Sequence, residues 1–170
     1  VTFPTDSKLY NKMRVKLVVL AKANAVELRQ SYTRVGRKAL CMSSRYFAAR
    51  QPKRGKKEVR KLKTYLRRVV GDITRKIADN AELKVIFKDS LDLANRLLKQ
   101  QPQDKNKIYS LHAPEVECIA KGKAHKKYEF GNKVSVAATS KSGLVVGIKA
   151  LHGNPYDGHT LNDTINQAER

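Results

Sequence analysis

The chain has 170 residues, enough for one domain or one domain with a large insertion, and 41% of them are hydrophobic, enough to bury a core. A formal net charge of +21 and a pI near 10.2 predict a polyanionic partner, nucleic acid first and an anionic membrane surface second. The two cysteines, Cys41 and Cys118, lack CxxC spacing, which argues against a zinc site or a disulfide framework and favours a reducing, cytoplasmic compartment.

The charge is unevenly distributed along the chain. Residues 1–100 hold 26 Lys and Arg against 8 Asp and Glu, a net +18, whereas residues 101–170 hold 10 against 7, a net +3. We therefore expect a basic helical region over 1–100 that binds the polyanion, and a more ordinary globular region over 101–170. No apolar run approaches the roughly 18 residues of a membrane span, so no segment is expected to cross a membrane; because nucleic acid ranks first for the charge, we expect no membrane partner.

Apolar side chains at helical intervals predict four helices in the first region. The first spans 7–29 and is capped by Asp6 or Ser7. Gly36 predicts a break, and a short helix over 37–50 ends before Pro52. The clearest helix spans 56–79, with Gly71 as a weak point inside it, and a fourth spans 81–99. A polar linker over 100–104 closes the helical part.

The pattern then changes to short β-branched runs. Residues 133–139 and 144–150 flank a turn that contains Gly143, which predicts a β-hairpin. A further strand is expected around 115–120, and a helix from Thr160 to Arg170. The predicted fold class is α+β.

A basic segment is the strongest candidate site. Lysines and arginines that hardly alternate with acids match a run of phosphates better than a salt-bridged surface, although a solvated helix face is the usual meaning of a charge run. The aromatic residues Tyr46, Phe47 and Tyr65 lie among them and could stack on bases, but we expect two of the three in the helix core. The predicted DNA-binding residues are Arg45, Arg50, Lys53, Arg54, Lys56, Lys57, Arg60, Lys61, Lys63, Arg67 and Arg68.

Three weaker candidates remain. The basic turn over 121–131 is either a second phosphate contact or a charged edge that discourages strand aggregation. The histidines form no HxxxH or HExxH motif, so a zinc site is disfavoured; they are His112, His125, His152 and His159. Asp157 is either a carboxylate for a two-metal site or, as we favour, part of a helix cap with Thr160.

The sequence resembles bacterial insertion-sequence transposases of the DDE type over nearly its whole length. The stretches that carry the resemblance are Asn154–Leu161 (NPYDGHTL) with the preceding Lys149–Gly153, the long run Glu115–Gly131, the opening Phe3–Tyr10 and the short Leu28–Tyr32. The resemblance implies a ribonuclease-H-like core that holds Mg²⁺ through an Asp-Asp-Glu set. The basic helices would be an insertion between its first two strands, and residues 101–170 would supply a hairpin and the first core helix.

The departure from the family pattern is equally informative. In that family the first catalytic Asp precedes the segment like Phe3–Asp6, the second follows the helix that begins near Thr160, and the Glu comes later. The resemblance therefore implies an internal fragment with no catalytic residue, no metal ligand and no cofactor of its own, inactive alone in DNA strand transfer. The abrupt opening at Val1 favours the same view.

Two other functions stay open at this stage. The chain could be a stand-alone basic DNA- or RNA-binding protein of the ribosomal type. It could also be a regulator that binds a full-length transposase, or a protein that associates with itself.

Overall fold

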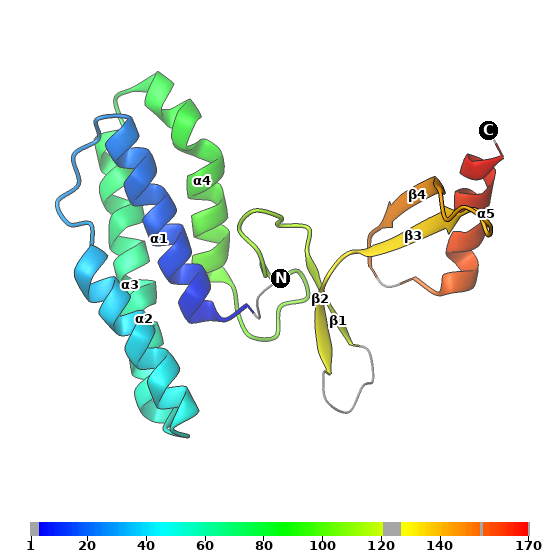
Figure 1. The fold of residues 1–170 in the computed structure, drawn as a ribbon. Helices are drawn as coiled ribbons and strands as arrows, with labels where there is room; N and C mark the ends of the chain where they lie inside the picture. Colours follow the sequence, from blue (N-terminus) through cyan, green and yellow to red (C-terminus); the bar gives the residue numbers. More distant parts are fainter. Residues whose placement is uncertain (1–3, 121–126, 154, 170) are drawn as a thin grey trace. The chain divides into compact units, whose positions relative to one another are not determined.

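The computed structural model describes residues 4–120, 127–153 and 155–169 (Figure 1). These residues form an α+β structure with five helices and two small antiparallel hairpins, which confirms the predicted class. The chain divides into a helical unit, residues 4–107, and a second unit, residues 108–169, that contains the strands.

The helical unit contains α1 (Asp6–Ala23), α2 (Thr33–Ala48), α3 (Pro52–Lys76) and α4 (Ala81–Lys99). The helix α3 packs against the other three. Its apolar stripe is buried as predicted, and burial of each large side chain stabilises the unit by about 1.5–3 kcal/mol. The largest fully buried side chains of this core are Met13 and Leu17 of α1, Leu62, Leu66 and Ile73 of α3, and Phe87 and Leu97 of α4.

The first helix is shorter than predicted. It ends at Ala23, where the Asn24 side-chain amide donates a hydrogen bond to the Leu20 carbonyl at 2.9 Å, and Ala25 then adopts a left-handed φ of 54°. Residues 24–32 consequently form an extended connection, although Leu28 continues the apolar spacing. The N-cap is also not the predicted one, because Thr5 Oγ1 accepts the Lys8 N–H at 3.4 Å.

The break expected at Gly36 is wrong. The helix α2 begins at Thr33 and runs through this glycine, which is buried against α1. A Cβ atom at position 36 would lie 2.9 Å from Nε of Arg14. Gly36 therefore makes room for the Arg14 side chain of α1, which is a tertiary requirement and not a signal for a turn.

The other two helices agree better with the sequence. The helix α3 begins at Pro52, four residues before the expected start, because proline is well tolerated in the first turn of a helix. The helix α4 has the predicted bounds, and the Asn80 side chain caps it by accepting the Leu83 N–H at 2.9 Å. Asn80 illustrates a local signal that fixes a helix start without help from tertiary contacts.

The second unit has two hairpins and one helix. Strand β1 (Glu117–Ala120) pairs antiparallel with β2 (Tyr128–Gly131), and β3 (Lys133–Ala138) pairs with β4 (Val145–Leu151). The predicted strands at 115–120, 133–139 and 144–150 are thus confirmed to within two residues. The turn between β3 and β4 includes Gly143, whose φ of 66° suits glycine.

Helix α5 (Asp157–Ala168) packs on one face of the β3–β4 hairpin. A Cβ atom at Gly147 would lie 2.8 Å from the Thr164 carbonyl oxygen, so glycine permits the close contact. The Thr164 hydroxyl donates to Ser135 Oγ at 2.9 Å. On the hairpin, the apolar side chains of Val134, Val136 and Ile148 are instead 49%, 52% and 58% exposed.

Candidate nucleic-acid interface

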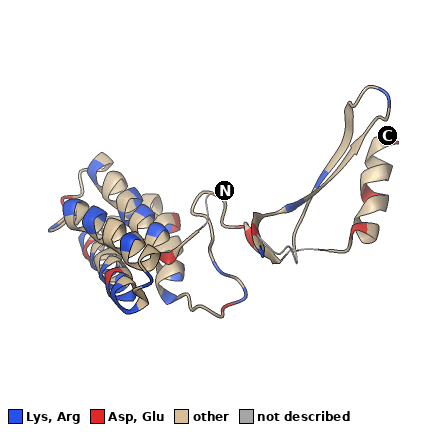
Figure 2. Cartoon of the chain, turned by 60° about the horizontal axis from the view of Figure 1, so that its bottom comes forward, with Lys and Arg blue, Asp and Glu red and all other residues tan. Residues whose placement is uncertain are grey.

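The cationic charge gathers on the helical hairpin formed by α2, α3 and their connection. Residues 33–76 contain sixteen lysines and arginines and two acids, so they carry a formal +14 of the chain's +21. In Figure 2, positions occupied by Lys and Arg are coloured blue, and they are more frequent along the ribbon of the helices than along the strands. We call residues 33–76 the basic hairpin.

The helical period separates the charges of α3 from its core. At 100° per residue, Lys57, Arg60 and Arg67 lie on the side opposite the buried stripe that contains Leu62 and Leu66. The cations face solvent because the apolar residues of the same helix are buried in the core. The helix itself therefore positions the cations, without a loop to hold them.

The structure places the predicted DNA-binding residues together on this hairpin. Arg45 is on α2, Arg50 is in the connection and the other nine are on α3. Ten of the eleven are exposed, and Lys63 is half-buried with its Nζ atom 5.9 Å from the centre of the Tyr10 ring. Lys63 therefore belongs more to the packing of α3 against α1 than to the open surface.

The two acids of the basic hairpin are already engaged. Glu58 Oε1 lies 2.6 Å from Lys61 Nζ, and the hydrogen bond between them raises the pKa of Lys61. Asp72 is buried and accepts the backbone N–H of Arg29 at 2.8 Å, with Arg75 Nη2 at 3.6 Å from its other oxygen. Asp72 also pairs with Lys76 at 3.9 Å, which is the remaining ion pair of the basic hairpin among the described residues. Neither carboxylate is therefore available to neutralise the other lysines and arginines.

The expectation that two of the three aromatic residues belong to the core is wrong. Phe47 is 46% exposed and covers Gly55, while Tyr46 is half-buried with the Arg54 guanidinium 5.9 Å from its ring centre. Tyr65 stacks on Tyr32, with ring centroids 4.8 Å apart and planes inclined by 11°. The aromatic rings thus line the hairpin surface beside the cations.

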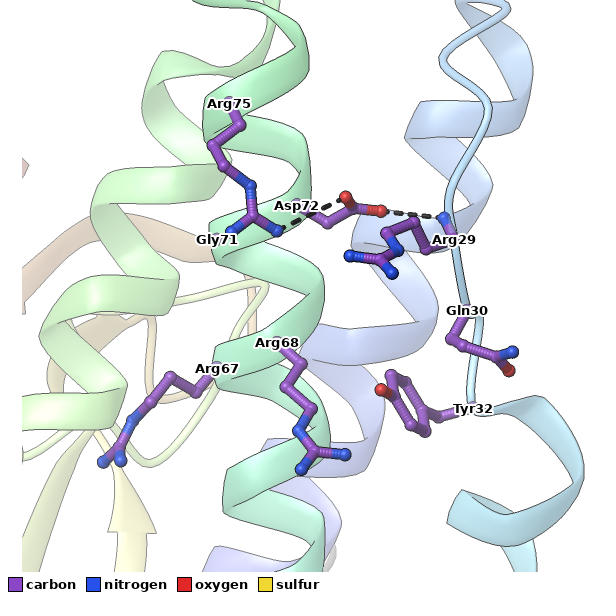
Figure 3. A pocket seen from close by; sticks show the side chains of 8 residues that line it. All are labelled: Arg29, Gln30, Tyr32, Arg67, Arg68, Gly71, Asp72 and Arg75. Atoms are coloured by element: carbon purple, nitrogen blue, oxygen red, sulfur yellow. Dashed lines mark hydrogen bonds and ion pairs between the residues drawn. The ribbon is translucent and has the colours of Figure 1, made fainter.

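A groove between α3 and residues 29–32 was not predicted. It encloses about 560 Å³ and is lined by Arg29, Gln30, Tyr32, Arg67, Arg68, Gly71, Asp72 and Arg75. Figure 3 shows the side chains of Arg29 and Arg68 entering the space between α3 and the connection, while Arg67 leaves α3 on the side away from Tyr32. Arg68 and Arg75 lie two helical turns apart on α3, so the sequence could have indicated that part of the groove. Arg29 joins it only through tertiary structure.

The groove wall formed by residues 27–32 is held by specific bonds. Arg14, which is buried, donates from Nη1 to the Ser31 carbonyl at 2.7 Å, and Lys76 donates to the Glu27 carbonyl. With the bond from the Arg29 N–H to Asp72, these contacts fix an extended segment beside α3 at several points. Burial lowers the pKa of Arg14, and its Nε is a buried donor that finds no hydrogen-bond partner among the residues that the structure describes.

The weaker candidates receive little support as sites. Of the basic turn over 121–131, residues 121–126 lie outside the described residues, as does His125, and Lys127 is exposed. No group of three His, Cys, Asp or Glu able to hold a metal occurs among the residues that the structure describes. His152 instead lies 3.1 Å from Glu117 Oε1, and the ring of His159 meets Tyr156 edge-on.

Asp157 starts a helix, but its side chain does not cap it. The N-cap of α5 is Tyr156, which makes no side-chain cap bond, and Asp157 is the first helical residue. Its carboxylate pairs with Lys133, and the Thr160 hydroxyl donates to the Asp157 carbonyl at 2.8 Å. The predicted cap is therefore wrong in its bonding; a carboxylate in the first turn still suits the helix dipole.

The helices of the described residues do not have the character of membrane spans. None of them combines the length and the apolarity that a membrane crossing needs.

Comparison with known proteins adds one partial similarity. No family model matches the chain, and no solved structure matches it. The chain is similar to an uncharacterised protein of Rhizobium meliloti, ORF8 in the nfe locus, with 49% identity over 51 residues. The matched stretch covers 30% of this chain and 25% of that protein.

Proposed function

We propose that this chain binds DNA through the phosphate backbone, with the exposed side of the basic hairpin as the contact surface. The observation that carries the proposal is the +14 charge of residues 33–76, whose two acids are both engaged within the fold. Among the described residues the other cations of this surface form no ion pair, so the phosphates of DNA can supply the missing negative charge. Lysine and arginine side chains that contact the DNA phosphates do not read the base sequence, so the binding is expected to be non-specific.

The length of the charged surface suits a duplex. Cations extend along α3 from Lys53 to Arg75, which at 1.5 Å per residue is roughly 33 Å. One turn of B-DNA measures about 34 Å. A single helix that lies along the duplex can therefore span about one turn and meet phosphates where a backbone strand passes beneath it, and the core stripe of α3 keeps its cations on the outer side.

We further propose, from the sequence resemblance, that the DNA binding derives from a transposase of the DDE type. On this proposal the β3–β4 hairpin and α5 correspond to part of a ribonuclease-H-like core. The exposed apolar face of Val134, Val136 and Ile148 supports this, because such a face in a larger sheet would be covered. None of the family's three catalytic positions matches a residue of this sequence, so the proposal assigns no catalytic residue and no strand-transfer step to this chain.

A matched pair of variants tests the DNA-binding surface. One replaces Lys57, Arg60 and Arg67 of α3 by Gln, and the other replaces the exposed Lys16, Lys84 and Lys88 of α1 and α4. Each lost phosphate contact lowers the affinity about fivefold at 0.15 M salt, so the α3 variant should bind a 30-base-pair duplex about 10²-fold more weakly. The second variant removes the same charge and should stay close to the wild type, because the Debye length is about 8 Å.

Fluorescence anisotropy of labelled duplex measures both affinities. Equal losses in the two variants would show that net charge, and not the surface of α3, determines binding. Competition with an RNA duplex of equal length belongs to the same experiment, because a clear preference for RNA would replace the proposed ligand by the ribosomal-type alternative.

A further inference from the structure

The groove beside α3 contains a feature that folding alone does not explain. Gly71 lies in the interior of a 25-residue helix, where glycine is about 1 kcal/mol less favourable than alanine. Apart from its chain neighbours and the local backbone of α3, a Cβ atom at position 71 would meet no atom of the described residues within 4 Å, so no close contact among them requires glycine. This contrasts with Gly36, Gly55 and Gly147, where a Cβ atom would clash with a neighbour.

Arginines surround the open backbone at Gly71. Arg68 precedes it by three residues and Arg75 follows it by four, so all three lie on the same side of α3. Arg29 faces them from the connection, and its side chain enters the same space (Figure 3). The groove also contains one carboxylate, Asp72, which binds the Arg29 backbone N–H and lies 3.6 Å from Arg75.

The backbone on one side of the groove is held by the fold. The bond from Arg29 N–H to Asp72 fixes the position of Arg29, and the bond from Arg14 to the Ser31 carbonyl fixes the adjacent backbone. Tyr32 is stacked on Tyr65 and closes one side of the groove. The planar guanidinium of an arginine that extends into the groove can bind two oxygens of one phosphate, which a lysine ammonium cannot reproduce.

We propose that this groove seats one backbone phosphate of the bound DNA, with Arg29, Arg68 and Arg75 as donors and Gly71 as the surface on which the phosphate rests. The proposal rests on the proposed function and deepens it, because it names one fixed contact within an otherwise diffuse surface. The absence of a side chain at position 71 lets the phosphate approach the helix backbone. The groove would set the register of the duplex along α3.

The first test changes no charge. Gly71→Ala should raise the melting temperature by about 2–4 °C, because alanine favours the helix, and should weaken duplex binding at least threefold. Thr64→Ala is the control, since Thr64 is exposed on α3 outside the groove and should leave the affinity unchanged. A Gly71→Ala protein that binds DNA like the wild type would overturn the proposal.

The second test keeps the charge and changes the geometry. Arg68→Lys should weaken binding at least fivefold, whereas Arg96→Lys, at an exposed position of α4 outside the basic hairpin, should stay within twofold of the wild type. Equal affinities for the two variants would also overturn the groove proposal while leaving the DNA-binding surface intact. If the wild-type protein itself fails to bind duplex DNA at 50 mM salt, the proposed function fails, and the two failures are thus distinguishable.

Discussion

Gly36→Ala should destabilise the protein, although alanine is the better helix former. Position 36 is inside α2, and the new Cβ atom would lie 2.9 Å from Nε and 3.2 Å from Cζ of Arg14. Arg14 is 2% exposed, so its guanidinium has no open solvent into which it could move without a rearrangement of the contact between α1 and α2.

The magnitude follows from the bonds that Arg14 would lose. It donates to the Ser31 carbonyl at 2.7 Å and to Asn11 Oδ1 at 3.1 Å. Hydrogen bonds that involve a charged group contribute about 1.5–3 kcal/mol each, and the gain in helix propensity is about 1 kcal/mol. Loss of both bonds therefore lowers the free energy of unfolding by about 2–5 kcal/mol net.

Urea unfolding followed by circular dichroism at 222 nm measures this change. Gly71→Ala is the matched control, because the same substitution in open space should raise the free energy of unfolding by up to about 1 kcal/mol. The two substitutions should therefore change the free energy of unfolding in opposite directions. If Gly36→Ala is as stable as the wild type or more stable, Arg14 is not confined as described and its bond to the Ser31 carbonyl does not hold the groove wall.

Three further predictions concern other parts of the chain. Burial, and secondarily the charge of Asp6, raises the pKa of Tyr10, so the stability that Tyr10 contributes should be complete below about pH 10 and decline above it. In urea titrations, Tyr10→Phe should reduce this alkaline decline in stability, and an unchanged decline would contradict the prediction. Gly147→Ala should weaken the packing of α5 on the β3–β4 hairpin by about 1–3 kcal/mol, because the new Cβ atom would meet the Thr164 carbonyl oxygen. Amide hydrogen exchange should then become faster in α5 but not in α3, and unchanged exchange in α5 would refute the prediction. The purified chain with Mg²⁺ should neither cut nor join insertion-sequence end DNA, and any strand-transfer product on a gel would contradict the proposal that it carries no catalytic residue.

The helices were largely predictable because their stability comes from apolar stripes that the sequence displays. The buried set of α3, including Leu62, Leu66 and Ile73, appears at the expected spacing, and Asn80 marks the start of α4. The end of α1 was missed because it depends on the backbone conformation of Ala25, which has a left-handed φ that the residue type does not indicate.

The same contrast applies to the candidate site. The exposed cations of α3 could be found from charge density and helical period, which are local properties. The groove could not be found in this way, because the hydrogen bond from Arg29 to Asp72 joins residues 43 positions apart. Gly71 was recognised as a weak point in the helix, but its open surroundings became visible only in the folded chain.

The salt dependence of wild-type DNA binding tests the central claim most directly. Six exposed cations lie on the side of α3 away from the core or toward the groove, namely Lys53, Lys57, Arg60, Arg67, Arg68 and Arg75. If all six contact phosphates, a plot of log affinity against log salt has a slope of about −5, and affinity for a 30-base-pair duplex falls about 10³-fold between 50 and 200 mM salt. A slope between zero and −1, or no binding at 50 mM salt, would contradict the account.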